Sequence, residues 1–139
     1  MLTRDQIEAR VPHAGRMCLL DSVQSWNEAT IVCRAAAPDA THPLARGPGV
    51  PAIAAAEYAA QAAAIHGALL DGADRPRDGL LAKLTDVELS DVLLDEAGGT
   101  LTVTAELLAR LESGCQYLFE VRNERTSVAR GRLLVAFTS

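Results

Sequence analysis

The sequence predicts an α+β fold in which one long helix packs on one antiparallel sheet of about five to six strands. One stretch of strong helix formers is apolar on nearly every side, as expected for a buried helix. Two strand-like segments separated by a turn precede it, and about four more follow it. Because the helix is rich in alanine, we expect the sheet to curl closely around it.

The helices are delimited by their flanking residues. One or two helical turns are expected within residues 2–11, with Thr3 as N-cap and Gln6 completing an approximate capping box. The long helix is expected over residues 52–70. Pro51 suits its first turn, because the missing N–H is no loss there. The segment DGADRPRDG then ends the helix.

The strands follow from alternation and turn residues. A hairpin is expected from MCLLDSVQSW and IVCRAAA around the turn NEAT. After the helix, strands are expected at 80–91, 100–113, 115–126 and 128–139, with turns near Gly98-Gly99, Gly114 and Ser127. One face of the 100–113 strand carries Leu101, Val103, Ala105 and Leu107. In the next strand, Phe119 and Val121 lie on one face, and Leu118, Glu120 and Arg122 lie on the other.

Composition favours one globular domain over residues 1–139. The chain has 139 residues, 49% of them hydrophobic, and a formal net charge of −5, which argues against a nucleic-acid protein. Three cysteines, Cys18, Cys33 and Cys115, form neither a disulfide framework nor a CxxC pair. We expect them to be small buried residues in a reducing compartment.

The apolar run over residues 50–70 is long enough to cross a bilayer. It would, however, place Glu57 near the midplane, where an acid costs roughly 2.5–3.5 kcal/mol. A buried helix of a globular protein is therefore the better interpretation. The N-terminal residues have no apolar core of a signal peptide, so we expect a cytoplasmic location.

Glu57 and Gln61 are unexpected within so apolar a helix. They are four residues apart and only about 40° from each other around the axis, so they share a face. A buried carboxyl group needs a partner or a cavity. A hydrogen bond from Gln61 would stabilise the buried Glu57 carboxyl group. Alternatively, this face of the helix lines a binding site. A salt-bridged core residue or a subunit contact is the alternative.

The start of the same helix adds groups that are suited to catalysis. Its free N–H groups, near Ala52 and Ile53, suit developing negative charge. His42 lies upstream, in a loop that we expect to fold back over the helix start. A partly neutral carboxyl group, an imidazole and two N–H groups form a set for acid–base chemistry beside a carbonyl.

These residues also carry a family resemblance over nearly the whole chain. VPHAGRMCLLDSV is similar to an early PH…LLDRV segment, HPLARGPGVPAIAAAEYAAQAAA to an HFPG…PGV…EAMAQ block, and the strand-rich tail fits as well. The chain thus resembles the hot-dog-fold 3-hydroxyacyl-(acyl-carrier-protein) dehydratases, and within them the branch found with aryl-polyene and fatty-acid-like gene sets. The most specific piece is EYAAQ.

The resemblance implies a function and roles. His42 would remove the C2 proton, Glu57 would protonate the leaving hydroxyl, and Ala52 and Ile53 would polarise the thioester carbonyl. Gln61 would orient Glu57. The substrate would arrive on the phosphopantetheine of an acyl carrier protein, with no separate cofactor, and two protomers would complete the site as a homodimer or with a related chain. A weakly active partner subunit stays open, because HPLA replaces HFPG after the histidine position. An acyl thioesterase stays open as well, because it is the other common activity that the resemblance to this fold implies.

Other polar residues receive plainer interpretations. His13 is expected to be structural. His66 lies about 180° from Glu57 and is expected at the surface or an interface. Asp21 is expected to cap the backbone or pair with a basic residue, and Trp26 to pack at an edge. Four arginines near the C-terminus are expected to form either a solvated face or a docking site for an acidic carrier protein. They are Arg122, Arg125, Arg130 and Arg132. The three histidines do not have the spacing of a metal site.

Overall fold

The computed structural model describes residues 2–8, 19–38, 50–72, 79–90 and 99–137. One six-stranded sheet has the order β1-β2-β4-β5-β6-β3, with every neighbouring pair antiparallel. The strands are β1 Ser22–Trp26, β2 Thr30–Ala36, β3 Gly79–Leu89, β4 Thr100–Leu111, β5 Gly114–Arg122 and β6 Ser127–Phe137. The helices are α1 Arg4–Glu8, the 3₁₀ turn η2 Ala52–Ala54 and α2 Ala55–Asp71.

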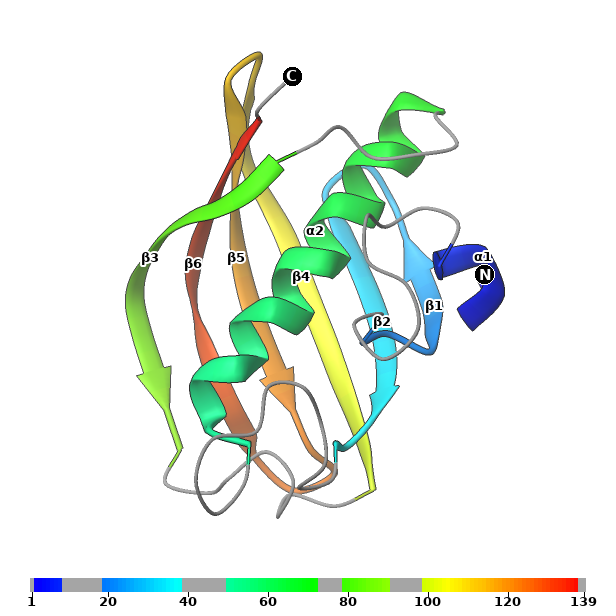
Figure 1. Cartoon of the computed structure of the whole chain (residues 1–139), viewed down its shortest axis with the longest axis vertical. Coiled ribbons are helices and arrows are strands. Elements are labelled where there is room, and N and C mark those ends of the chain that lie inside the picture. Colours follow the sequence, from blue (N-terminus) through cyan, green and yellow to red (C-terminus); the bar gives the residue numbers. More distant parts are fainter. Residues whose placement is uncertain (1, 9–18, 39–49, 73–78, 91–98, 138–139) are drawn as a thin grey trace.

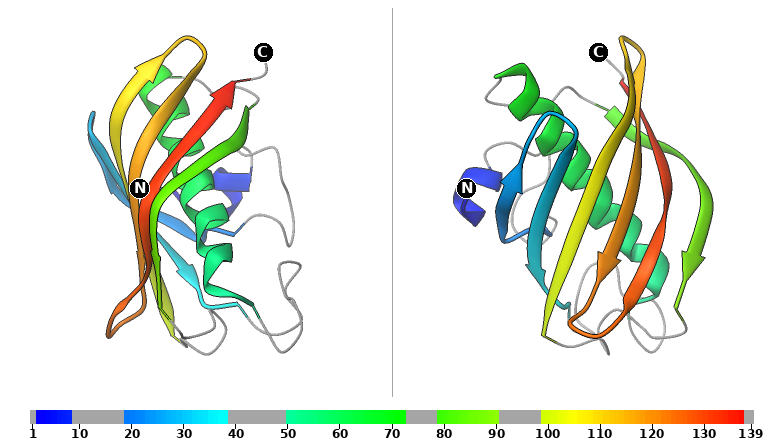
Figure 2. Two further views of the ribbon diagram at one scale, coloured as in Figure 1. Left: turned by 90° about the vertical axis from the view of Figure 1, so that its left-hand side faces the viewer. Right: turned by 180° about the vertical axis from the view of Figure 1, so that it is seen from behind.

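The sheet wraps around α2, which confirms the predicted layer architecture. Figure 1 shows α2 running diagonally across one face of the sheet, and Figure 2 shows the strands curving around it. Inward-facing side chains alternate along β4 as predicted: Leu101, Val103 and Ala105 are fully buried. On α2, Ala55, Ala59 and Ala62 are also fully buried. Since alanine is small, the sheet approaches the helix backbone closely.

The long helix has the predicted bounds within a few residues. Pro51 is extended and precedes η2, which leads directly into α2. At the other end Gly72 takes a left-handed conformation with φ of 62°, and its N–H bonds to the carbonyls of Ala68 and Leu69. Glycine tolerates that conformation at no steric cost, so the helix ends where the sequence predicted. Among the described helices, none has the length and hydropathy needed to cross a membrane.

The N-terminal residues cover one edge of the sheet. The backbone N–H of Thr3 donates to Gln6 Oε1 at 3.0 Å, which is half of the predicted capping box. Ile7 of the resulting short helix is fully buried. Just before that helix, Leu2 forms a bridge with Val23, whose N–H donates to the Leu2 carbonyl at 3.0 Å. This bridge partly satisfies the outer edge of β1.

The opposite edge is formed by β3, which is long and irregular. Its register with β6 shifts twice, between Leu81 and Lys83 and between Thr85 and Glu88. In the second bulge Asp86 has a positive φ of 54°. Gly131 on β6 faces this bulge, and an added Cβ there would come within 3.1 Å of the Thr85 carbonyl oxygen. The glycine therefore lets the bulged strand cross β6 at close range.

Candidate active site

Glu57 lies in the first turn of α2, on the face turned away from the sheet. Its side chain is exposed, and Ile53, one turn earlier, is 43% exposed. The sequence led us to expect a buried carboxyl group. Within one chain that burial is absent, because the sheet covers the opposite side of the helix. A carboxylate and an isoleucine thus lie together on an open surface at the start of α2.

The helix start supplies N–H groups beside this surface. The first internal hydrogen bond of η2 runs from the Ala54 N–H to the Pro51 carbonyl at 3.0 Å. The N–H groups of Ala52 and Ile53 precede that bond, as the first N–H groups of a helical turn always do. Ala52 itself is 8% exposed. This arrangement could stabilise negative charge on an oxygen atom held near Ile53 and Glu57.

Gln61 lies one turn beyond Glu57 and is only 6% exposed. Its Oε1 accepts a hydrogen bond from the backbone N–H of Leu19 at 3.0 Å. That bond ties α2 to the residues that precede β1. The predicted contact with Glu57 stays a prediction, while the bond to Leu19 is a role that the sequence did not reveal.

His66 is a correction to the sequence analysis. It does lie opposite Glu57 on α2, but it is fully buried and not at the surface. Its Nε2 lies 2.7 Å from the Asn27 carbonyl oxygen, and its Nδ1 lies 2.7 Å from the Tyr117 hydroxyl. Burial lowers the pKa of His66 below its usual 6.5, despite the hydrogen bond to Asn27, and the charge of Arg110 lowers it further.

The sequence contained a signal for this burial. His66 follows Ala62 and Ala63 by four and three residues, so it lies on their apolar, sheet-facing side of the helix. Tyr117, its partner on β5, is 1% exposed. Their rings meet edge to face with centroids 5.6 Å apart. The pair therefore joins the C-terminal half of α2 to the sheet, far from Glu57 along the helix.

Three residues of the sequence analysis lie outside the described part of the chain. His42, the predicted base, and His13, predicted to be structural, both lie outside the described residues. Cys18 is outside them as well, whereas Cys33 and Cys115 are free and buried, as predicted for these two. Within the described part of the chain, no three His, Cys, Asp or Glu side chains gather as a metal site would require.

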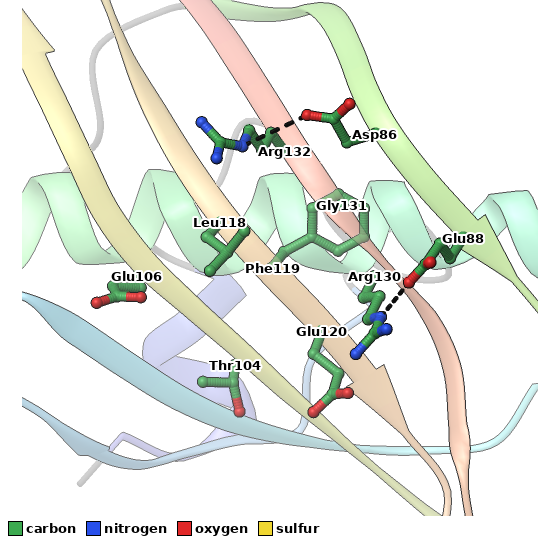
Figure 3. Close-up of a pocket in the computed structure, with 10 residues that line it drawn as sticks. All are labelled: Asp86, Glu88, Thr104, Glu106, Leu118, Phe119, Glu120, Arg130, Gly131 and Arg132. Carbon is green, nitrogen blue, oxygen red and sulfur yellow. Dashed lines mark hydrogen bonds and ion pairs between the residues drawn. The ribbon is translucent and has the colours of Figure 1, made fainter.

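Arg130 and Arg132 lie on the outer face of the sheet, with α2 on the other side (Figure 3). Arg130 pairs with Glu88, and Arg132 lies 3.6 Å from Asp86, both acids being on β3. Arg122 lies 3.7 Å from Glu120. These ion pairs favour the solvated-face interpretation over a free basic surface.

A hollow of about 520 Å³ lies between these pairs, lined in part by Glu106, Leu118 and Glu120. Figure 3 shows Leu118 and Glu120 on β5, in front of the helix. The hollow is therefore on the opposite side of the sheet from Glu57, and it is separate from the candidate site. Trp26, expected to pack at an edge, is 44% exposed at the end of β1.

A long helix wrapped by a six-stranded antiparallel sheet of this order defines a hot-dog-fold protein. Within that class, a family model described as ApeP-like, ApeP dehydratase, matches residues 5–138. The chain therefore belongs to the ApeP-like dehydratase family, as the resemblance predicted. No protein with a curated function matches the sequence.

Solved structures support the fold. A chain of the dehydratase heterocomplex ApeI:P from Xenorhabdus doucetiae matches with a TM-score of 0.81 and 21% identity, covering 100% of this chain and 93% of that one. A Staphylococcus aureus thioesterase gives 0.62 and 17%, covering 85% and 93%. A hypothetical thioesterase of Streptococcus pneumoniae, solved with coenzyme A, gives 0.58 and 12%, covering 85% of each chain.

Proposed function

We propose that this chain takes part in the dehydration of 3-hydroxyacyl thioesters, carried on an acyl carrier protein, to trans-2-enoyl thioesters. The pathway would be aryl-polyene or fatty-acid-like biosynthesis in the cytoplasm. The observation that carries the proposal is the position of Glu57 in a chain of the ApeP-like dehydratase family. Its carboxyl group is exposed beside the first N–H groups of the long helix.

The proposed chemistry uses each group once. The N–H groups of Ala52 and Ile53 polarise the thioester carbonyl, which makes the C2 proton more acidic. His42 takes that proton, and Glu57 gives a proton to the C3 hydroxyl, which leaves as water. Glu57 must then be protonated when the substrate binds, and an apolar cover would favour that form. The phosphopantetheine belongs to the carrier protein, so no separate cofactor is required.

The cover would come from a second hot-dog chain. Within the described residues β3 pairs on one side only, with β6, so its other edge has free backbone groups along 11 residues. The edge of β1, in contrast, already bonds Leu2. An open edge of this length is a template for strand addition. We propose that a related chain adds to β3 and encloses the exposed face at Ile53 and Glu57.

A second candidate is a weakly active subunit that supports an active dehydratase. The exposure of Glu57 and Ile53 favours it, because one chain leaves the site open. The ApeI:P structure from Xenorhabdus doucetiae is a heterocomplex, which supports an assembly of two different chains. In that case the related hot-dog chain would contribute most of the turnover.

The test is to purify this chain alone and together with a related hot-dog chain. Light scattering gives the oligomeric state, and mass spectrometry follows a 3-hydroxyacyl carrier protein. Loss of water by the homodimer supports the main proposal, and turnover only by the two-chain complex supports the second. Release of free acid, in place of an enoyl product, would identify a thioesterase.

Variants assign the roles. Glu57→Gln is expected to lower kcat by about 10²–10⁴-fold, because the amide cannot donate an acid proton. His42→Asn is expected to do the same. Glu124→Gln is the matched control, since Glu124 is an exposed carboxylate in the turn before β6. Wild-type turnover in the Glu57→Gln protein would refute the proposed acid.

A further inference from the structure

Three residues before β1 form a strap between the long helix and the sheet. The strap is defined as Leu19–Asp21. Leu19 and Leu20 are 5% and 0% exposed, although they belong to no strand. Both ends of the strap make hydrogen bonds to other elements, so it connects parts of the chain that are distant in sequence.

The first end of the strap is held by α2. The Leu19 N–H donates to Gln61 Oε1 at 3.0 Å, across 42 residues of sequence. Gln61 is one helical turn from Glu57 and shares its face. This hydrogen bond opposes rotation of α2, because a rotated helix would leave the buried Gln61 oxygen without a donor and the Leu19 N–H without an acceptor. This bond therefore restrains the direction in which the Glu57 face points.

The other end is held by β2. The Asp21 N–H donates to the Arg34 carbonyl at 2.8 Å, and Asp21 Oδ2 accepts from the Ala36 N–H at 2.7 Å. The carboxylate thus satisfies the last N–H of β2, which is the predicted capping role. The chain runs on from Ala36 towards His42, six residues later and outside the described residues.

Asp21 is also linked to the helix by its charge. The pKa of Tyr58 is raised, first by burial and then by the negative charge of Asp21. Tyr58 is 1% exposed and is the neighbour of Glu57 in sequence. The hydrogen bond of Asp21 therefore holds the end of β2, while its charge disfavours ionisation of a buried residue next to Glu57.

We propose that Asp21 is a positioning residue for the proposed dehydration. Through the strap, whose first end is held by Gln61, it fixes the rotation of α2, and with it Glu57, relative to the end of β2. Misplacement of a reacting group by about 1 Å can cost about 10²-fold in rate. This inference rests on the proposed function for its kinetic part only.

The experiment compares Asp21→Ala, Asp21→Asn and Asn27→Ala in the full assembly. Asn27 is the matched control, because its Oδ1 also accepts backbone N–H groups, from Ala29 and Thr30, but at the opposite end of β2. Asn27→Ala keeps the main-chain carbonyl that contacts His66 on α2. Asp21→Ala is expected to lower kcat by about 10–100-fold with KM changed less than about threefold. Asp21→Asn keeps one oxygen for the Ala36 N–H and should restore most of kcat. Asn27→Ala should lose similar stability and keep kcat.

A second measurement does not need activity. The Ile53 δ1 methyl lies on the Glu57 face, so its NMR signal reports the orientation of α2. This signal should shift in Asp21→Ala and in Gln61→Leu, relative to wild type. In the double variant the shift should be nearly the same as in either single variant, because both changes release the same strap. In Asn27→Ala the signal should stay in place. Equal shifts in Asp21→Ala and Asn27→Ala would overturn the inference. An inactive wild type with the expected methyl shifts would refute the proposed reaction and leave the strap in place.

Discussion

Tyr117→Phe is the sharpest test of the buried contact between α2 and the sheet. A carbonyl oxygen only accepts, so the 2.7 Å contact with the Asn27 carbonyl places the proton of the neutral ring on His66 Nε2. Nδ1 is then the acceptor, and the Tyr117 hydroxyl donates to it at 2.7 Å. Phenylalanine would leave Nδ1 without that donor in a site that is fully buried.

An unsatisfied buried acceptor costs about 1–3 kcal/mol. For a chain of this length that corresponds to about 4–12 °C in Tm. Thermal and urea unfolding at neutral pH measure the loss. In a His66→Leu background the same Tyr117→Phe change should cost far less, which gives a coupling above about 0.5 kcal/mol. Equal stability of Tyr117→Phe and wild type, within about 0.3 kcal/mol, would refute the assigned tautomer and the hydrogen bond.

Three further predictions concern the fold. The folded pKa of His66 lies below 6.5, so the stability that the neutral ring contributes is complete above pH 6.5 and is lost as the pH falls below it. His66→Gln should therefore show a flatter dependence of unfolding free energy on pH below 6.5, measured by urea unfolding. Gly114→Ala should lower the free energy of unfolding by about 1–3 kcal/mol, because the added Cβ would lie 2.3 Å from the Val135 carbonyl oxygen. Gly67→Ala has open space around the added Cβ and should stabilise the helix. Equal effects of the two substitutions would contradict this reasoning. Burial raises the pKa of Cys33 to about 12, so iodoacetamide should label it only after urea unfolding, and rapid labelling of the native protein would show that the thiol is accessible.

Much of the fold was predictable, because it depends on patterns that are local in sequence. Pro51 and Gly72 mark the two ends of the helical segment by their own backbone preferences. Alternation placed Leu101, Val103 and Ala105 on one face of their strand, and the structure buries all three. The pairing of β3 with β6, and the bulge opposite Gly131, were not predictable, because pairing partners are chosen by contacts far apart in the chain.

The candidate site was predicted only in part. Residue types and spacing pointed to Glu57, but they could not show that one chain leaves it exposed, since exposure depends on which helix face the sheet covers. His66 was assigned to the surface or an interface. Its position beside Ala62 and Ala63 indicated the apolar face, but its partners on β5 and in the β1–β2 turn could not be predicted from the sequence. The role of Gln61 changed for a similar reason, because Leu19 lies 42 residues away.

Local sequence patterns are sufficient to define the elements: an alanine-rich helix with defined ends, strands with one apolar face, and a carboxyl group with free N–H groups at the helix start. Those features arise from backbone preferences and from periodicity, which need only near neighbours. Packing between distant residues determines that Glu57 faces outward, that Asn27 and Tyr117 satisfy the two ring nitrogens of His66, and that Asp21 and Gln61 hold the strap between α2 and β2. Burial and hydrogen-bond partners are properties of residues brought together from distant parts of the chain, and the packing of the sheet around the helix selects them.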